Sequence, residues 1–205
     1  ALDMMNTAKE SMVPPFEISV FPDPAGSFTT AAAMVACTEK TLKHKFNTTL
    51  KDKNIIIYGG KGIVGGISAI MCAKEGSKCT IVGYDGITNV KKKAEEYKSR
   101  FGVDIIPADG TTDELNSSYL PQADIIFCAA RAGTQVISEE QLQLAKNTKV
   151  LADVNAVPPA GLGGVNLKDD DAEHPCGGLS IGPLTSGDIK VKTQYRMFEK
   201  MCAAD

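Results

Sequence analysis

The chain has no tryptophan, only two histidines, and no Cys-x-x-Cys pair among its six cysteines. Structural zinc sites need closely spaced cysteines and histidines, so this pattern argues against a metal centre. The cysteines are scattered, and four of them stand in apolar or helical surroundings, which is typical of reduced, buried thiols in a cytoplasmic protein. We therefore predict a cytoplasmic protein without a metal site.

Excess positive charge and long apolar runs are also lacking. The net charge of −3 provides no basic surface for nucleic acid, and no apolar run approaches the length that spans a membrane. The first residues, Ala-Leu-Asp-Met, do not resemble a signal peptide. With 43% hydrophobic and 23% charged residues, the composition predicts an ordinary soluble globular protein, with no nucleic-acid or membrane partner.

Glycine, by contrast, is abundant, and three glycines follow the strand-like run Asn54–Tyr58 in the pattern Gly-x-Gly-x-x-Gly. In a dinucleotide site, the first glycine permits the tight turn, the second lets the backbone approach a pyrophosphate, and the third lets helix and strand pack closely. The helix that follows would direct its free N–H groups at the phosphates. We predict that the cofactor contacts this turn at Gly60, Lys61, Gly62, Ile63, Val64 and Gly65. A tight turn without a ligand is the alternative.

A phosphate-binding P-loop is excluded at this turn. Ile55 stands where that motif needs its first glycine, and no serine or threonine follows Lys61.

From residue 54 onward, apolar runs of strand length alternate with helical patterns. Strands are predicted at 54–58, 78–83, 103–107, 123–128, 149–154 and 178–182, and helices at 63–75, 88–101 and 138–146, with an irregular crossover at 111–118. This alternation predicts an α/β fold, a doubly wound, mostly parallel Rossmann sheet with helices on both faces.

The segments outside this repeat have their own patterns. A frayed helix is predicted within 1–15, a strand at 16–21, and long helices at 28–43 and 186–202. We divide the chain into a remnant of an N-terminal domain with a connecting helix (1–45), a dinucleotide-binding domain (46–185), and a C-terminal helix that packs back towards the first part (186–205).

Strand 78–83 ends in Tyr84-Asp85, and Asp85 lies twenty residues after Gly65. A carboxylate there can accept hydrogen bonds from both ribose hydroxyls of the adenosine and would repel a 2′-phosphate, which favours NAD over NADP. Asp85 as a simple turn residue before a glycine is the alternative. Lys91–Lys93 could reach a phosphate and permit NADP, although such a run is more typical of a solvated helix face.

Two further strand ends offer candidates. Ala129 and Ala130 follow one strand and would let the cofactor pass over the sheet edge, unless they serve packing alone. Asp153 and Asn155 follow the next strand, and Asn155 could bind the nicotinamide carboxamide or the substrate, or else stabilise its own loop.

No side chain presents itself as a catalytic acid or base. His44 ends a basic helix, and His174 follows the acidic segment 169–173, so neither histidine stands at a predicted strand end. The acidic segment has no recognisable spacing of metal ligands and is predicted to be a solvated loop.

Four segments together resemble the NAD(P)-dependent methylene-tetrahydromethanopterin dehydrogenases, which are relatives of the methylene-tetrahydrofolate dehydrogenases. They are Asp23-Pro-Ala-Gly-Ser-Phe-Thr-Thr-Ala-Ala-Ala33, Gly59-Gly-Lys-Gly-Ile-Val-Gly65, Ala152-Asp-Val-Asn-Ala-Val-Pro-Pro-Ala-Gly-Leu-Gly-Gly164, and Ser180-Ile-Gly182 with Ile189-Lys-Val-Lys192. Their order and spacing extend from about residue 14 to residue 200. The segment that begins at Ala152 is the most specific of the four.

The resemblance implies an enzyme that transfers a hydride from the methylene carbon of a reduced pterin to NAD or NADP and leaves a methenyl cation. It implies substrate contacts at Thr29, Thr30, Asp153 and Asn155, a homo-oligomer, and an N-terminal pterin-binding domain of which only the last part is visible. Lys190 and Lys192 match basic positions without an assigned role.

One departure concerns the cofactor. NADP-specific members carry a basic pair where this chain has Tyr84-Asp85, which favours NAD or the use of both cofactors. The alternatives are a methylene-tetrahydrofolate or shikimate-type dehydrogenase, and a dinucleotide-binding module without catalysis.

Overall fold

Strand β1 (Asn54–Tyr58) is buried on both faces, which places it at the centre of a sheet. Ile55 and Ile57 contribute to one apolar core, whereas Ile56 and Tyr58 contribute to another. Because successive side chains of a strand point to opposite faces, a continuous apolar run of this kind is typical of a parallel sheet covered on both sides. The core therefore forms two layers, one on each face of the sheet.

The computed structural model describes residues 4–203, and within them seven strands form one sheet in the order β3-β2-β1-β4-β5-β7-β6. All neighbouring pairs are parallel except the edge pair β6–β7. The other strands are β2 (Lys78–Gly83), β3 (Ile106–Asp109), β4 (Ile125–Cys128), β5 (Val150–Asp153), β6 (Asp170–Glu173) and β7 (Leu179–Ile181). The chain order changes direction between β1 and β4, where doubly wound folds bind their ligands.

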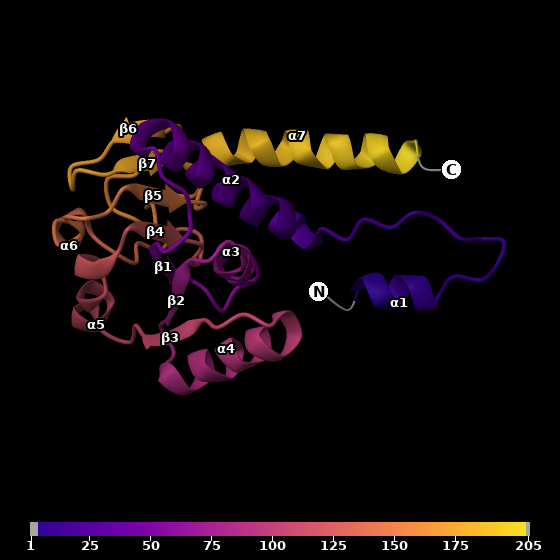
Figure 1. Cartoon of the computed structure of the whole chain (residues 1–205), viewed down its shortest axis with the longest axis horizontal. Helices are drawn as coiled ribbons and strands as arrows, with labels where there is room; N and C mark the ends of the chain where they lie inside the picture. The colour runs from indigo at the N-terminus through magenta and orange to yellow at the C-terminus, as the bar shows by residue number, and fades with distance from the viewer. Residues whose placement is uncertain (1–3, 204–205) are drawn as a thin grey trace.

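The two faces carry different helices (Figure 1). One core joins the sheet to the three long helices α2 (Ser27–Phe46), α3 (Ile63–Lys74) and α4 (Ile87–Phe101). The other face is covered by short elements, namely α5 (Asp113–Ser118), η2 (Leu120–Gln122) and α6 (Glu139–Leu142). The predicted doubly wound, mostly parallel sheet is confirmed.

Helix α7 (Pro183–Cys202) leaves the end of β7 and packs against α2. The two helices are tied at the start of α2, where Gln194 Nε2 donates a hydrogen bond to the Asp23 carboxylate at 2.8 Å. The rings of Phe21 and Phe198 meet edge to face nearby, with centroids 6.4 Å apart. The carboxyl half of α7 and α1 (Met4–Glu10) extend away from the sheet (Figure 1).

The Asp23 carboxylate caps the first turn of α2. It accepts hydrogen bonds from the backbone N–H of Phe28 at 2.9 Å and from the Thr29 hydroxyl at 2.6 Å. Burial opposes ionisation, but the hydrogen bonds from Thr29, Gln194 and Phe28 prevail and lower the pKa of Asp23 below its ordinary value of 3.8. Asp23 thus satisfies N–H groups that the helix itself leaves without partners, and it joins α2 to α7.

The change Asp23→Ala is expected to lower the free energy of unfolding by about 1–2 kcal/mol at pH 7, as loss of a helix cap does elsewhere. Because the folded pKa is lowered, the contribution of the carboxylate is present above pH 3.8 and is lost as the pH falls through the folded pKa. Urea unfolding of both proteins from pH 7 to pH 3 should show the difference shrinking at low pH. A constant difference would mean that the carboxylate charge has no part in it.

Two predicted elements are wrong. Residues 16–21 form no strand, and Phe16 and Ile18 are 80% and 75% exposed. This segment lies away from the sheet and pairs with no strand, and its last residue, Phe21, packs against the ring of Phe198 instead (Figure 1). The acidic segment is not a solvated loop, because Asp170–Glu173 forms β6 and pairs with β7. Charged residues suit such an edge strand, since they hinder pairing with other chains.

Other boundaries shift by a few residues. The strand predicted at 103–107 begins later, at Ile106, and the helix predicted at 138–146 ends at Leu142. The N-terminus of that helix has the capping box that its sequence favours, in which Gln141 N–H donates to Ser138 Oγ at 3.2 Å. The helix predicted within 1–15 spans Met4–Glu10, with residues 1–3 outside the described part of the chain. The three-part division of the chain stays a prediction.

Candidate dinucleotide site

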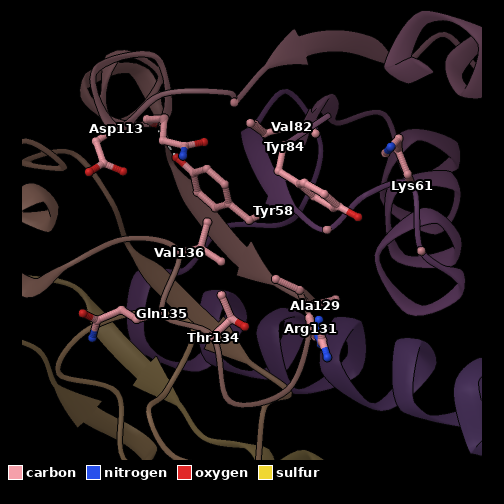
Figure 2. Close-up of a pocket in the computed structure, with 16 residues that line it drawn as sticks. Tyr58, Lys61, Val82, Tyr84, Asp113, Ala129, Arg131, Thr134, Gln135 and Val136 are labelled. Atoms are coloured by element: carbon pink, nitrogen blue, oxygen red, sulfur yellow. Dashed lines mark hydrogen bonds between the residues drawn. The ribbon is translucent and has the colours of Figure 1, made fainter. Parts of the chain in front are cut away.

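A cleft of about 620 Å³ opens at the carboxyl ends of β1, β2 and β4. Figure 2 shows Tyr58 at its centre, with Tyr84 and Lys61 on one side and Thr134 and Gln135 on the other. The carboxyl ends of parallel strands meet at one edge of the sheet, where ligands of doubly wound folds bind. The cleft therefore lies where the glycine turn and the reversal of strand order predict it.

The three glycines of the motif between β1 and α3 differ in the space that a side chain would have. A Cβ at Gly65 would lie 2.6 Å from the carbonyl oxygen of Gly59, and a Cβ at Gly60 would overlap the Ile81 side chain. At Gly62, a Cβ would meet only the Gly59 oxygen, at 3.2 Å. Gly65 and Gly60 thus serve the packing of the turn, whereas Gly62 borders open space in the cleft.

Gly62 is also the residue directly before α3, and it caps this helix without a side chain. The first N–H groups of α3 are therefore the groups that an anion in the cleft could reach. Ile63 is 45% exposed and Val64 is half-buried, and the backbone N–H groups of both belong to the first turn of α3. The residues present fit a pyrophosphate, because a bare backbone and a helix N-terminus meet at a position that a Cβ would fill.

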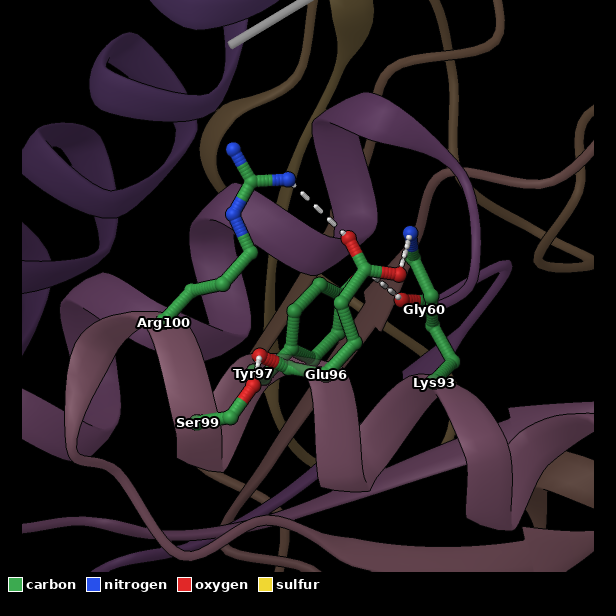
Figure 3. A network of polar contacts seen from close by, with 6 residues as sticks. All are labelled: Gly60, Lys93, Glu96, Tyr97, Ser99 and Arg100. Atoms are coloured by element: carbon green, nitrogen blue, oxygen red, sulfur yellow. Dashed lines mark hydrogen bonds and ion pairs between the residues drawn. The ribbon is translucent and has the colours of Figure 1, made fainter. Parts of the chain in front are cut away.

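Helix α4 supports the turn from outside. The Tyr97 hydroxyl donates a hydrogen bond to the carbonyl oxygen of Gly60 at 3.1 Å, and burial raises the pKa of this phenol. Figure 3 shows this contact beside the ion pairs of Glu96 with Lys93, at 2.7 Å, and with Arg100, at 3.3 Å. These side chains border a groove of about 170 Å³ on the outer side of Lys61. Lys93 is thus engaged within α4, and Lys91 and Lys92 are exposed.

At the end of β2, Lys61 forms an ion pair with Asp85, whose carboxylate also accepts a hydrogen bond from Asn89 Nδ2 at 3.1 Å. The hydrogen bond from Lys61 is the main cause of the lowered pKa of Asp85. The Lys61 ammonium lies 5.4 Å from the centroid of the Tyr84 ring, which is 83% exposed. The structure therefore brings Lys61, Tyr84 and Asp85 together.

Beyond β4, Ala129 and Ala130 line the cleft, whereas Asn155 is buried beside it. Asn155 Oδ1 accepts hydrogen bonds from the N–H groups of Gly133 and Val157, and its Nδ2 donates to the carbonyl oxygen of Pro159 at 2.9 Å. These bonds connect the loop after β4 to the loop after β5. Asn155 therefore stabilises both loops, and its role in binding stays a prediction.

Asp153 ends β5 and is 1% exposed. Its carboxylate accepts hydrogen bonds from the N–H groups of Asn155, at 2.8 Å, and Leu162, at 2.9 Å. Burial raises the pKa of this carboxyl, although these hydrogen bonds work in the opposite direction. Asp153 thus fixes both ends of the loop 154–162 by hydrogen bonds to its backbone.

Thr29 and Thr30 lie in the first turn of α2, outside the main cleft. Thr29 is 4% exposed and donates to Asp23, while the half-buried Thr30 donates to the carbonyl oxygen of Gly26 at 2.7 Å. Phe28, next to them, borders the outer groove together with Lys61 and Gly62. The start of α2 therefore lies close to the glycine turn, although the two threonines contact neither the turn nor the cleft.

Several cleft residues were missed from the sequence. Asn116 and Asp113 come from α5, and Arg131, Thr134 and Gln135 come from the loop after β4. Polar residues that follow a predicted strand could have indicated the second group. Asn116 comes from the irregular crossover, where the sequence pattern predicted no strand end that would place a residue in the cleft. Its carbonyl oxygen accepts a hydrogen bond from Tyr58 Oη at 2.7 Å.

His174 directly follows β6 and is buried, which the prediction of a solvated loop missed. Its Nε2 lies 2.8 Å from the carbonyl oxygen of Gly163, and its Nδ1 accepts the N–H of Cys176 at 3.2 Å. Because β6 runs antiparallel to the other strands, its carboxyl end lies at the sheet edge opposite the cleft. His174 is therefore a structural residue and not part of the site.

Among the described residues, 4–203, no group of three or more acidic, histidine or cysteine side chains could hold a metal ion. In the same part of the chain, no helix is both long and apolar enough to cross a membrane.

Comparisons with known proteins identify similar chains. No protein-family model matches. Over all 205 residues the chain is 46% identical to the NAD(P)-dependent methylenetetrahydromethanopterin dehydrogenase of Methylorubrum extorquens, and it spans 69% of that protein. Over 198 residues, 97% of the chain, it is 28% identical to the bifunctional protein MdtA of the same organism and spans 67% of it. It thus covers about two thirds of the length of both relatives.

Among solved structures, the chain is similar to an L-alanine dehydrogenase, with a TM-score of 0.60 and 12% identity, covering 93% of this chain and 57% of that one. It is also similar to the quinate dehydrogenase of Corynebacterium glutamicum, solved in complex with NAD, with a TM-score of 0.60 and 16% identity, covering 83% and 56%. At such low identity these similarities establish the fold alone, and the chain spans little more than half of either structure.

Proposed function

The chain belongs to the family of NAD(P)-dependent methylenetetrahydromethanopterin dehydrogenases, and from this premise we propose that it transfers a hydride from the methylene group of methylenetetrahydromethanopterin to NAD(P). The observation that carries the proposal is Gly62, where the cleft is open to a pyrophosphate at the N-terminus of α3 and would be closed to it by any side chain. The fold and the family membership agree with this use of the cleft.

The proposed reaction needs no catalytic acid or base. One C–H bond of the methylene carbon breaks, and the hydrogen leaves with both electrons as a hydride. The methenyl product carries the positive charge that remains, so no proton is transferred. When bound, the nicotinamide supplies the hydride acceptor. The chain contributes a fixed position for the two reactants.

In the proposed complex the cofactor extends along the cleft from the end of β2 to the end of β4. The pyrophosphate would lie against Gly62 and the first N–H groups of α3. The adenosine ribose would lie beside Tyr84 and Asp85, and the nicotinamide would pass over Ala129 and Ala130. Asp85 favours NAD in this arrangement, because a carboxylate accepts hydrogen bonds from ribose hydroxyls and repels a 2′-phosphate.

For the substrate we propose the space between the start of α2 and the loop after β5, where Thr29, Thr30, Asp153 and Asn155 stand. The hydroxyl oxygen of Thr30 can still accept a hydrogen bond, whereas Asp153 and Asn155 would act by holding the loop that forms the wall. A remnant of a pterin-binding domain in residues 1–45, a cytoplasmic location and a homo-oligomer complete the proposal. The family resemblance supports the domain and the oligomer, and the free cysteines support the location.

The test is formation of NADH or NADPH, followed by absorbance, with methylenetetrahydromethanopterin, methylenetetrahydrofolate and shikimate as separate substrates. We expect turnover with the first. Turnover with methylenetetrahydrofolate or shikimate alone would replace the proposed substrate. No turnover with any of them, together with measurable NADH binding, would instead support a dinucleotide-binding module.

A further inference from the structure

Lys61 occupies an unusual place in the glycine turn. It is the residue between Gly60 and Gly62, so its backbone borders the position of the pyrophosphate, yet its side chain reaches across to the end of β2. A Cβ at Gly83 would lie 3.4 Å from Lys61 Cε, which shows that the aliphatic part of the lysine passes over this bare strand end. The ammonium then lies between the Tyr84 ring and the Asp85 carboxylate.

The Lys61–Asp85 pair is partly accessible, with side-chain exposures of 23% and 33%. Lys61 borders both the main cleft and the outer groove. Asp85 has a second partner in Asn89, which lies one helical turn away on α4. The pair can therefore open without leaving the carboxylate unpartnered, and partial solvation keeps the energetic cost of opening small.

We propose that Lys61 and Asp85 together form a selector that sets the relative affinities for NAD and NADP, a role that rests on the proposed function of the cleft. With NAD, Asp85 accepts the ribose hydroxyls and keeps Lys61 as its counter-ion. With NADP, Lys61 leaves Asp85 and pairs with the 2′-phosphate, while Asn89 retains the carboxylate. One cleft would thereby accept both cofactors, although Asp85 alone would exclude NADP.

The charges of Asp85, Lys61 and a 2′-phosphate favour this arrangement over a selector formed by Asp85 alone. A 2′-phosphate beside Asp85 alone would place like charges a few ångströms apart, which is unfavourable even at a solvated site. An ammonium between them offsets this repulsion and forms charge-assisted hydrogen bonds to the phosphate. Lys93 is the lysine of α4 that borders the same outer groove as Lys61, but it is paired with Glu96 at 2.7 Å and its ammonium lies 5.2 Å from the centroid of the Tyr97 ring.

The experiment compares two probes that differ only in the 2′-phosphate and carry no nicotinamide, namely 5′-AMP and 2′,5′-ADP. Their dissociation constants are measured by calorimetry for the unmodified chain, Lys61→Met, Asp85→Asn and the control Lys93→Met, after melting curves confirm the fold of each. Lys61→Met should weaken 2′,5′-ADP at least tenfold and change 5′-AMP less than threefold. Asp85→Asn should tighten 2′,5′-ADP about tenfold and weaken 5′-AMP severalfold. Lys93→Met should change neither probe by more than twofold.

An equal effect of Lys61→Met on both probes would overturn the selector and leave the proposed cofactor site intact. A selective loss of 2′,5′-ADP in Lys93→Met would assign the role to α4 and overturn the selector as well. If the unmodified chain binds neither probe, the cofactor site itself is wrong and the selector falls with it.

Discussion

The change Gly62→Ala is expected to weaken NADH binding about a hundredfold while the chain keeps its fold. The backbone of Gly62 has φ −71° and ψ 169°, which any residue adopts, and its Cβ would meet only the Gly59 oxygen, at 3.2 Å. The methyl group would instead occupy the open space where the pyrophosphate approaches α3. Loss of one or two charge-assisted hydrogen bonds, at about 1.5–3 kcal/mol each, accounts for an effect of that size.

Two further glycine variants make this result specific. Gly187→Ala, on α7, meets no atom within 4 Å and should leave both NADH binding and stability unchanged or slightly improved. Gly65→Ala should destabilise the fold itself, because its Cβ would lie 2.6 Å from the backbone oxygen of Gly59. NADH titration by fluorescence and thermal melting separate the three cases. Undiminished NADH binding by Gly62→Ala would rule out a pyrophosphate at this turn.

The change Asp153→Ala is expected to lower the free energy of unfolding by about 3 kcal/mol, since two buried N–H groups lose their acceptor at about 1–3 kcal/mol each. The groups are the backbone N–H of Asn155 and of Leu162. For a chain of this size the melting temperature should fall by about 6–12 °C. The loop 154–162 should also lose order, which would reduce hydride transfer by much more than it reduces NADH binding.

Asp153→Asn provides the comparison, because the amide retains one acceptor oxygen and should therefore lose about half as much stability. Thermal melting and amide hydrogen exchange of residues 154–162 measure both effects. A melting temperature of Asp153→Ala within 2 °C of the unmodified chain would show that the carboxylate does not hold this loop, and would leave substrate contact as its remaining role.

The alternation of apolar strands and helices was sufficient to predict the sheet, because a strand buried on both faces leaves a continuous apolar run such as Ile55–Ile57. The glycine turn was predictable because its requirements are local. A tight turn, a close approach of the backbone to a ligand and close packing of helix and strand each need a residue without a side chain. Strand β6 was not predictable in this way. Three of its four residues are acidic, and they form a strand because they pair with β7 at the edge of the sheet.

The cleft brings together some of the residues that the sequence proposes for cofactor binding. Lys61, Tyr84 and Ala130 line it, but the pairing of Lys61 with Asp85 depends on how β2 lies beside the glycine turn, which spacing alone does not show. The same holds for Asn116, which enters the cleft from an irregular crossover. Asn155 and Asp153 illustrate the opposite case: polar residues at strand ends are positioned for a ligand or for a loop, and the sequence pattern is the same for both.

The most direct test of hydride transfer in this cleft uses methylenetetrahydromethanopterin deuterated at the methylene carbon, with NAD and NADP in separate reactions. Mass spectrometry of the reduced cofactor then reports where the label goes. The account predicts one deuterium in the nicotinamide ring for each methenyl product formed, at a rate that Gly62→Ala lowers strongly when the cofactor is limiting. Reduced cofactor without deuterium, or no reduction by a chain that binds NADH, would contradict it.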